Sequence, residues 1–113
     1  MDLQSITVHF SPEEKVNVLF EGTLYDLTFN ASFSDLKTNL EGLYETEFTV
    51  VTIQLTEDQY GLGAESRLVL IKANGQTEII NLAVLSSEQP TFYTNLQAAR
   101  VILENELTNI LNA

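Results

Sequence analysis

Apolar residues recur at helical spacing near the C-terminus, from Pro90 to Leu111. At about 100° per residue, one set of side chains falls within an arc of about 60°, the stripe of a helix that packs on a single surface. The members of this stripe are Phe92, Leu96, Ala99, Leu103, Leu107 and Ile110. Pro90 suits a first turn, where a missing backbone N–H has no cost. The pattern predicts a long amphipathic helix that starts after a polar break at residues 86–89.

In the first half of the chain, apolar and polar residues alternate with the period of two that predicts strands. We expect one strand over residues 5–10 and a hairpin over residues 15–31. A two-residue loop at Glu21 and Gly22 sets Val18 opposite Tyr25 and puts the apolar residues of both strands on one face.

Asn74 and Gly75 lie between two apolar runs. They form the preferred pair for a type I′ hairpin turn, in which both residues have positive φ. This turn would set Leu70 opposite Ile79. Because both faces of the hairpin are apolar away from its tip, we expect it to lie centrally in the fold.

Between these hairpins, apolar residues from Leu36 to Tyr44 repeat at helical spacing, with Ser32 or Ser34 as the expected N-cap. A strand over residues 46–55 and a loop over residues 56–66 follow. The order of three strands and a helix then occurs twice, so a duplicated unit is one hypothesis. We expect a single α+β domain over residues 1–113. It would have a largely antiparallel sheet of about six strands in βββα-βββα order, a short middle helix, and a long C-terminal helix packed on the sheet.

The charge of the chain is far from neutral, because 16 acidic residues face five basic ones and give a net charge of −11. Such a surface repels nucleic acid and anionic lipid, so we expect neither as a partner. The longest aliphatic run, Leu68 to Ile71, is too short to span a bilayer, and no leader pattern is visible. These features predict a cytoplasmic protein that either uses its charge for solubility or binds a basic protein partner.

Few residues offer catalytic chemistry. The chain has no cysteine, and its single histidine, His9, falls on the polar side of a strand, where we expect it to face solvent. Glu57, Asp58 and Glu65 could offer oxygens to calcium, but they lack the spacing of an EF-hand. Arg100 is expected to lay its stem on the core with its head outward. We therefore expect no enzyme, cofactor or metal site.

Two surfaces are candidates for binding a partner. Ala98, Val101 and Ile102 form an apolar group on the back of the long helix and suggest a homodimer or a protein partner. Six acidic residues and no base lie between Lys37 and Arg67. They are Glu41, Glu45, Glu47, Glu57, Asp58 and Glu65. If their segments meet, they form an acidic patch that either binds a partner or only promotes solubility.

The leading hypothesis is a non-enzymatic, acidic interaction or assembly module that self-associates. The alternative is a viral-type inhibitor that mimics nucleic acid and occupies a DNA- or RNA-binding protein, which would need carboxylates spaced like phosphates. An acid–base enzyme with paired carboxylates from distant parts of the chain remains a third hypothesis.

Overall fold

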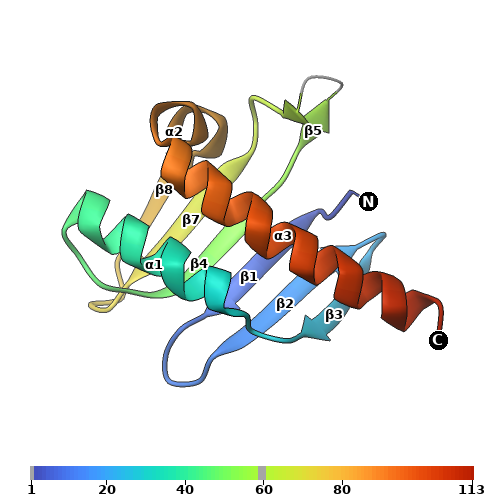
Figure 1. The fold of residues 1–113 in the computed structure, drawn as a ribbon. Helices are drawn as coiled ribbons and strands as arrows, with labels where there is room; N and C mark the ends of the chain where they lie inside the picture. Colours follow the sequence, from blue (N-terminus) through green and yellow to red (C-terminus); the bar gives the residue numbers. More distant parts are fainter. Residues whose placement is uncertain (1, 59–60) are drawn as a thin grey trace.

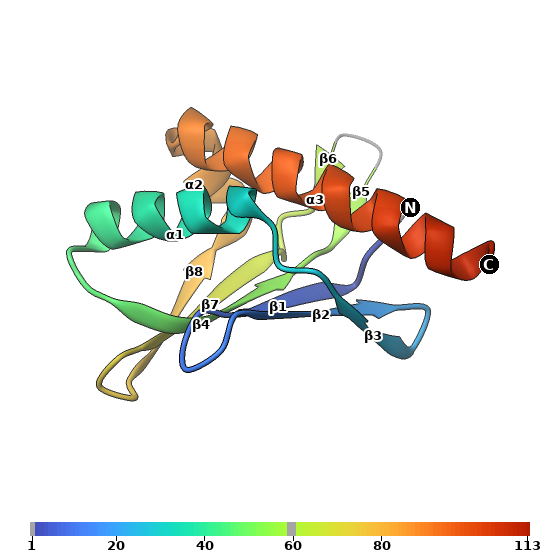
Figure 2. The ribbon, with the colours of Figure 1, turned by 60° about the horizontal axis from the view of Figure 1, so that its bottom comes forward.

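The computed structural model describes residues 2–58 and 61–113. Its strands are β1 (Ser5–His9), β2 (Lys15–Phe20), β3 (Thr23–Leu27), β4 (Phe48–Gln54), β5 (Glu57–Asp58), β6 (Gly61–Leu62), β7 (Arg67–Lys72) and β8 (Thr77–Asn81), and its helices are α1 (Ala31–Tyr44), α2 (Leu82–Glu88) and α3 (Pro90–Leu111). Six strands form one antiparallel sheet in the order β3-β2-β1-β4-β7-β8, and β5 pairs with β6. The helices lie on one side of this sheet (Figure 1 and Figure 2), which confirms the expected α+β class.

The core fills the space between the helices and the face of the sheet that they cover, which we call the inner face. Ile6 of β1 is fully buried there between its register partners Val18 and Ile53. The expected α3 stripe is buried as far as Leu107. Ile110 was expected in the same stripe but is exposed, because α3 runs past the edge strand β3 and has no sheet beneath its last turn (Figure 2).

The first hairpin has the register that the sequence predicts. Val18 pairs with Tyr25, and most apolar residues of β2 and β3 share the inner face, whereas Leu19 and Leu24 pair on the opposite face. Glu21 and Gly22 both have positive φ, of 49° and 78°, as a two-residue type I′ turn requires.

The second hairpin differs from its prediction at the turn. Gly75 has a φ of +90°, but Asn74 is not in the positive-φ region. The Gly75 N–H donates to the Lys72 carbonyl at 2.9 Å, and the Lys72 N–H donates to the carbonyl of Gln76 at 2.8 Å. The loop therefore has three residues, a type I turn followed by a glycine bulge, and is not a type I′ turn.

The extra loop residue shifts the register by one position. Leu70 pairs with Glu78, and Ile79 pairs with Val69 on the opposite face of the sheet. The expected central position is also wrong, because β8 is an edge strand.

Three local features correct the sequence interpretation. Asn30, and not Ser32 or Ser34, caps α1, and its side chain accepts the Ser32 N–H at 3.0 Å. Helix α2 occupies most of the expected polar break, and the side chain of Asn81 caps it by accepting the Val84 N–H at 2.9 Å. The expected loop at 56–66 contains the short β5–β6 hairpin.

The sheet is symmetric about its central pair of strands. β1, β2 and β3 meander outward on one side, and β4, β7 and β8 do so on the other. Thr7 pairs with Thr52 at the centre, with 3.4 Å between their hydroxyl oxygens. In the helical layer, the side chain of Asn95 in α3 donates to Asn39 in α1. The duplicated βββα unit stays a hypothesis, because the second half also contains β5, β6 and α2.

Candidate interaction surfaces

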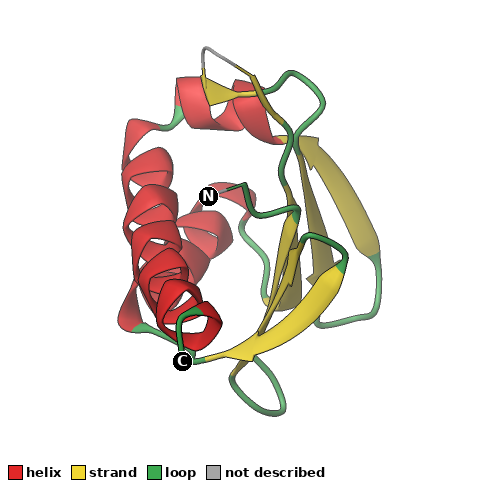
Figure 3. Cartoon of the chain, turned by 90° about the vertical axis from the view of Figure 1, so that its right-hand side faces the viewer, coloured by secondary structure: helices red, strands yellow, loops and turns green. Residues whose placement is uncertain are grey.

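The back of α3 carries the apolar group that the sequence predicts. Val101 is 55% exposed and Ile102 is 44% exposed, and Ala98 is also exposed. Leu103, next to them in sequence, is fully buried, so this helix separates a core side from an outward side. The outward side points away from the sheet (Figure 3).

Glu41 has a structural role within the fold. One of its carboxylate oxygens lies 3.0 Å from the Lys37 ammonium, and the other accepts the Phe48 N–H at 3.1 Å. It therefore ties the end of α1 to the start of β4. Glu45 and Glu47 are exposed in the connection between these two elements.

The segments that carry the six acidic residues do not meet. Glu41, Glu45 and Glu47 precede β4, whereas Glu57 and Asp58 form β5 beyond its other end, and Glu65 is exposed in the loop after β6. A strand of seven residues spans about 20 Å. A single patch requires the end of α1 and the loop after β4 to lie together, and they lie apart (Figure 1).

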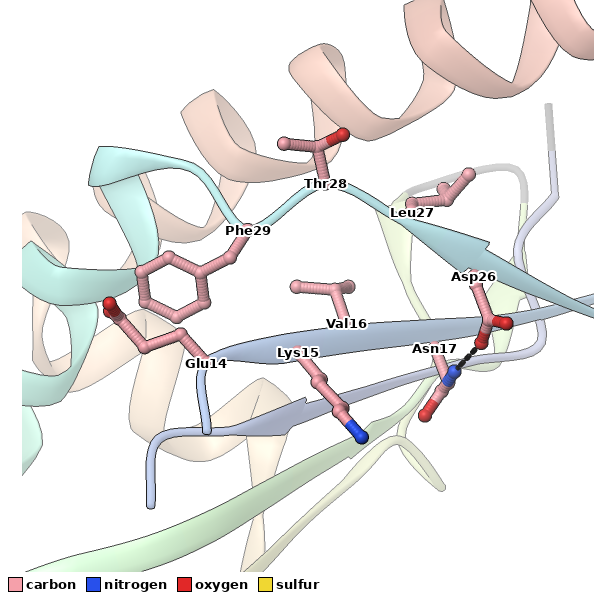
Figure 4. Close-up of a pocket in the computed structure, with 8 residues that line it drawn as sticks. All are labelled: Glu14, Lys15, Val16, Asn17, Asp26, Leu27, Thr28 and Phe29. Carbon is pink, nitrogen blue, oxygen red and sulfur yellow. Dashed lines mark hydrogen bonds between the residues drawn. The ribbon is translucent and has the colours of Figure 1, made fainter. Parts of the chain in front are cut away.

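A groove of about 640 Å³ opens where the chain leaves β3 beside the start of β2 (Figure 4). Its lining residues are Glu14, Lys15, Val16, Asn17, Asp26, Leu27, Thr28 and Phe29. The polar groups of this groove largely satisfy one another or their neighbours. The amide of Asn17 donates to Asp26, and the ammonium of Lys15 lies 3.1 Å from the carboxylate of Glu13. The hydroxyl of Thr28, which also lines the groove, donates to the carboxylate of Glu106 at 2.8 Å.

His9 is half-buried on the sheet, on the face away from the helices, where Lys15 and Val50 flank it in register. Within residues 2–58 and 61–113, no group of three or more His, Cys, Asp and Glu side chains could hold a metal ion.

Arg100 is buried, which corrects the expectation of an outward head. It donates to the Gln97 side chain at 3.1 Å and lies 3.8 Å from the Glu104 carboxylate. These neighbours on α3 keep its guanidinium hydrogen-bonded within the fold.

Tyr44 lies at the end of α1, where its ring makes an edge contact with Phe48. Burial raises the pKa of its phenol above the ordinary value of 10.0, and the carboxylates of Glu78 and Glu88 raise it further. The neutral phenol is thus the form that this site favours at physiological pH.

The sequence interpretation missed a third surface, the face of the six-stranded sheet away from the helices, which we call the outer face. Its side chains belong to Ser5, Thr7, His9, Lys15, Asn17, Leu19, Leu24, Asp26, Val50, Thr52, Gln54, Arg67, Val69, Ile71, Thr77, Ile79 and Asn81. No helix of the described chain covers it (Figure 3). The alternation along the strands shows which residues share a face, but it does not show which face the helices cover.

Among the described residues, no helix is long and apolar enough to cross a bilayer. Comparison with models of known protein families, with curated proteins and with solved structures finds no match to this chain.

Proposed function

We propose that this chain is a non-enzymatic protein–protein interaction or assembly module that self-associates through the back of α3. The exposure of Val101 and Ile102 beside Ala98 carries the proposal. Two apolar side chains with about half of their surface in water, on adjacent positions of a long helix, are better suited to a contact than to solvation.

The energetics of such a contact are favourable before the costs of association. Burying a valine and an isoleucine supplies about 1.5–3 kcal/mol each, and the loss of translational and rotational freedom opposes this gain. A twofold contact uses each residue twice, once from each copy, which doubles the apolar surface that one helix contributes.

The net charge of −11 favours a basic protein as a further partner and disfavours nucleic acid. The alternative of a nucleic-acid mimic has less support. It needs a continuous row of carboxylates, whereas the acidic residues before β4 and after it lie at opposite ends of that strand.

Sedimentation of Val101→Glu tests the proposed contact. A glutamate there places a charge in the contact on a side that is already exposed, so the fold should be retained while self-association weakens about tenfold or more. Gln76→Glu is the matched control, because it adds the same charge at the exposed tip of the β7–β8 hairpin and should leave self-association unchanged. A wild-type chain that stays monomeric at high concentration and moderate salt would overturn the proposal.

A further inference from the structure

The outer face of the sheet has a polar middle, but it carries two apolar groups where an uncovered sheet would ordinarily be polar. Val69 pairs with Ile79, and Val50 pairs with Ile71, so these four side chains form one cluster across β4, β7 and β8. Leu19 and Leu24 form a second pair across β2 and β3. Ile79 is 62% exposed and Leu24 is 64% exposed, which makes them the most exposed large apolar side chains described.

The same face is nearly free of the acidic residues that dominate the chain. Its only acid is Asp26, and its bases are Lys15 and Arg67, which give a formal charge of +1. The rest of the chain therefore carries −12, the difference between −11 and +1. Glu13, in the loop at the rim, pairs with Lys15 and brings the face closer to neutral.

This distribution makes the outer face the part of the chain least repelled by a second copy. Two outer faces meet with only one carboxylate each, Asp26, whereas two helical sides both belong to the remainder of the chain, which carries −12 in total. Thr7 and Thr52 occupy the middle of the face and are uncharged. The face is thus close to neutral, so a second copy of it adds little charge repulsion.

The area of the face is close to the minimum for such a contact. Six strands about 4.8 Å apart, each about five residues long, give a planar footprint of about 480 Å². Two such footprints together measure about 960 Å², near the roughly 1,000 Å² that a small specific interface buries. Two twisted sheets also pack face to face in a known geometry, with their strands about 30° apart.

We propose that the outer face binds the outer face of a second copy, so that two sheets form the centre of a four-layer helix–sheet–sheet–helix particle. This inference deepens the proposed function, self-association, but uses the side of the molecule opposite the back of α3. With one homotypic contact on each side, copies join alternately through helices and through sheets, and the assembly grows beyond a dimer.

Sedimentation of three variants separates the two contacts. Ile79→Glu should remove the sheet contact and leave a dimer joined by helices, and Val101→Glu should leave a dimer joined by sheets. The double variant should be monomeric, and Gln76→Glu should assemble as the wild type does. Ile79 is on an edge strand and is mostly exposed, so the fold should tolerate its replacement, and circular dichroism checks this.

The sedimentation results distinguish failure of the sheet contact from failure of the helix contact. If Ile79→Glu and a second variant, Ile79→Lys, both assemble as the wild type does, the sheet contact is overturned and the helix contact stands. If Val101→Glu has no effect while Ile79→Glu gives monomers, the proposed α3 contact fails and the sheet contact stands. A monomeric wild-type chain overturns both.

Discussion

At the scale of single residues, two glycines show how local space decides the effect of one methyl group. A Cβ on Gly63 would lie 2.9 Å from the backbone carbonyl oxygen of Thr56, whereas a Cβ on Gly42, within α1, would have no neighbour within 4 Å. Gly63→Ala should therefore lower the free energy of unfolding by about 1–3 kcal/mol. Gly42→Ala should raise it by about 0.5–1 kcal/mol, because alanine loses less backbone entropy in a helix. Urea denaturation of both variants checks this, and equal effects would contradict the close contact at Gly63.

Tyr44 should make stability depend on alkaline pH. Because burial raises the pKa of its phenol above 10.0 in the folded chain, the unfolded chain loses this proton first as the pH rises. Unfolding then releases a proton, so the free energy of unfolding falls as the pH rises above 10.0. Tyr44→Phe removes this contribution. Denaturation across the alkaline range should show a constant difference between wild type and variant below that pH and a relative loss for the wild type above it.

At the scale of elements, Glu106 fastens α3 to the end of the edge strand β3. Its carboxylate accepts the backbone N–H of Thr28 at 3.1 and 3.0 Å and the Thr28 hydroxyl at 2.8 Å. Since Thr28 is exposed, we expect Glu106→Ala to cost only about 1 kcal/mol of stability. We also expect faster hydrogen exchange at the Thr28 amide. Asn109→Ala, at an exposed position of the same helix, should change neither quantity.

The two hairpins show which registers the sequence can predict. In β2 and β3 the larger apolar set lies on one face, with only Leu19 and Leu24 on the other, so a one-residue shift would expose the core residues, and the pattern alone selects the observed pairing. In β7 and β8, neighbouring residues such as Val69 and Leu70 are both apolar, so a shift leaves the pattern unchanged. The register then depends on the length of the turn. The Asn-Gly pair fits both a two-residue loop and the three-residue loop that is present, so it does not predict which register forms.

The helix boundaries were predicted only where the sequence marks them clearly. Pro90 and the wide apolar stripe defined α3, and its bounds, Pro90–Leu111, agree with the prediction. Helix α2 was missed because Asn81 is both the last residue of β8 and the N-cap of α2, so no loop separates the two elements, and a run of mixed apolar residues has no clear period of its own.

At the scale of the whole molecule, the candidate surfaces were only partly predictable. The exposure of Val101 and Ile102 follows from helix geometry alone, because they lie far from the stripe that packs on the sheet. The acidic patch failed because nearness in sequence says nothing about which end of a strand each residue occupies. The outer face could not be predicted, since it depends on all the helices covering the same side of the sheet (Figure 3).

The charge distribution also predicts how each contact responds to salt. Two copies that meet through α3 bring together parts of the chain outside the outer face, which carry −12 in total on each copy, whereas two outer faces are close to neutral. Raising the ionic strength from about 0.1 M to about 1 M shortens the screening length from about 10 Å to about 3 Å and so weakens the repulsion between helical sides. We expect Ile79→Glu, which keeps only the helix contact, to associate about tenfold more tightly at the higher salt. Val101→Glu, which keeps only the sheet contact, should change by less than about threefold. Sedimentation equilibrium at both salt concentrations measures the dissociation constant of each variant. If the dissociation constant of Val101→Glu responds more strongly to salt than that of Ile79→Glu, the outer face is not the less charged of the two contacts.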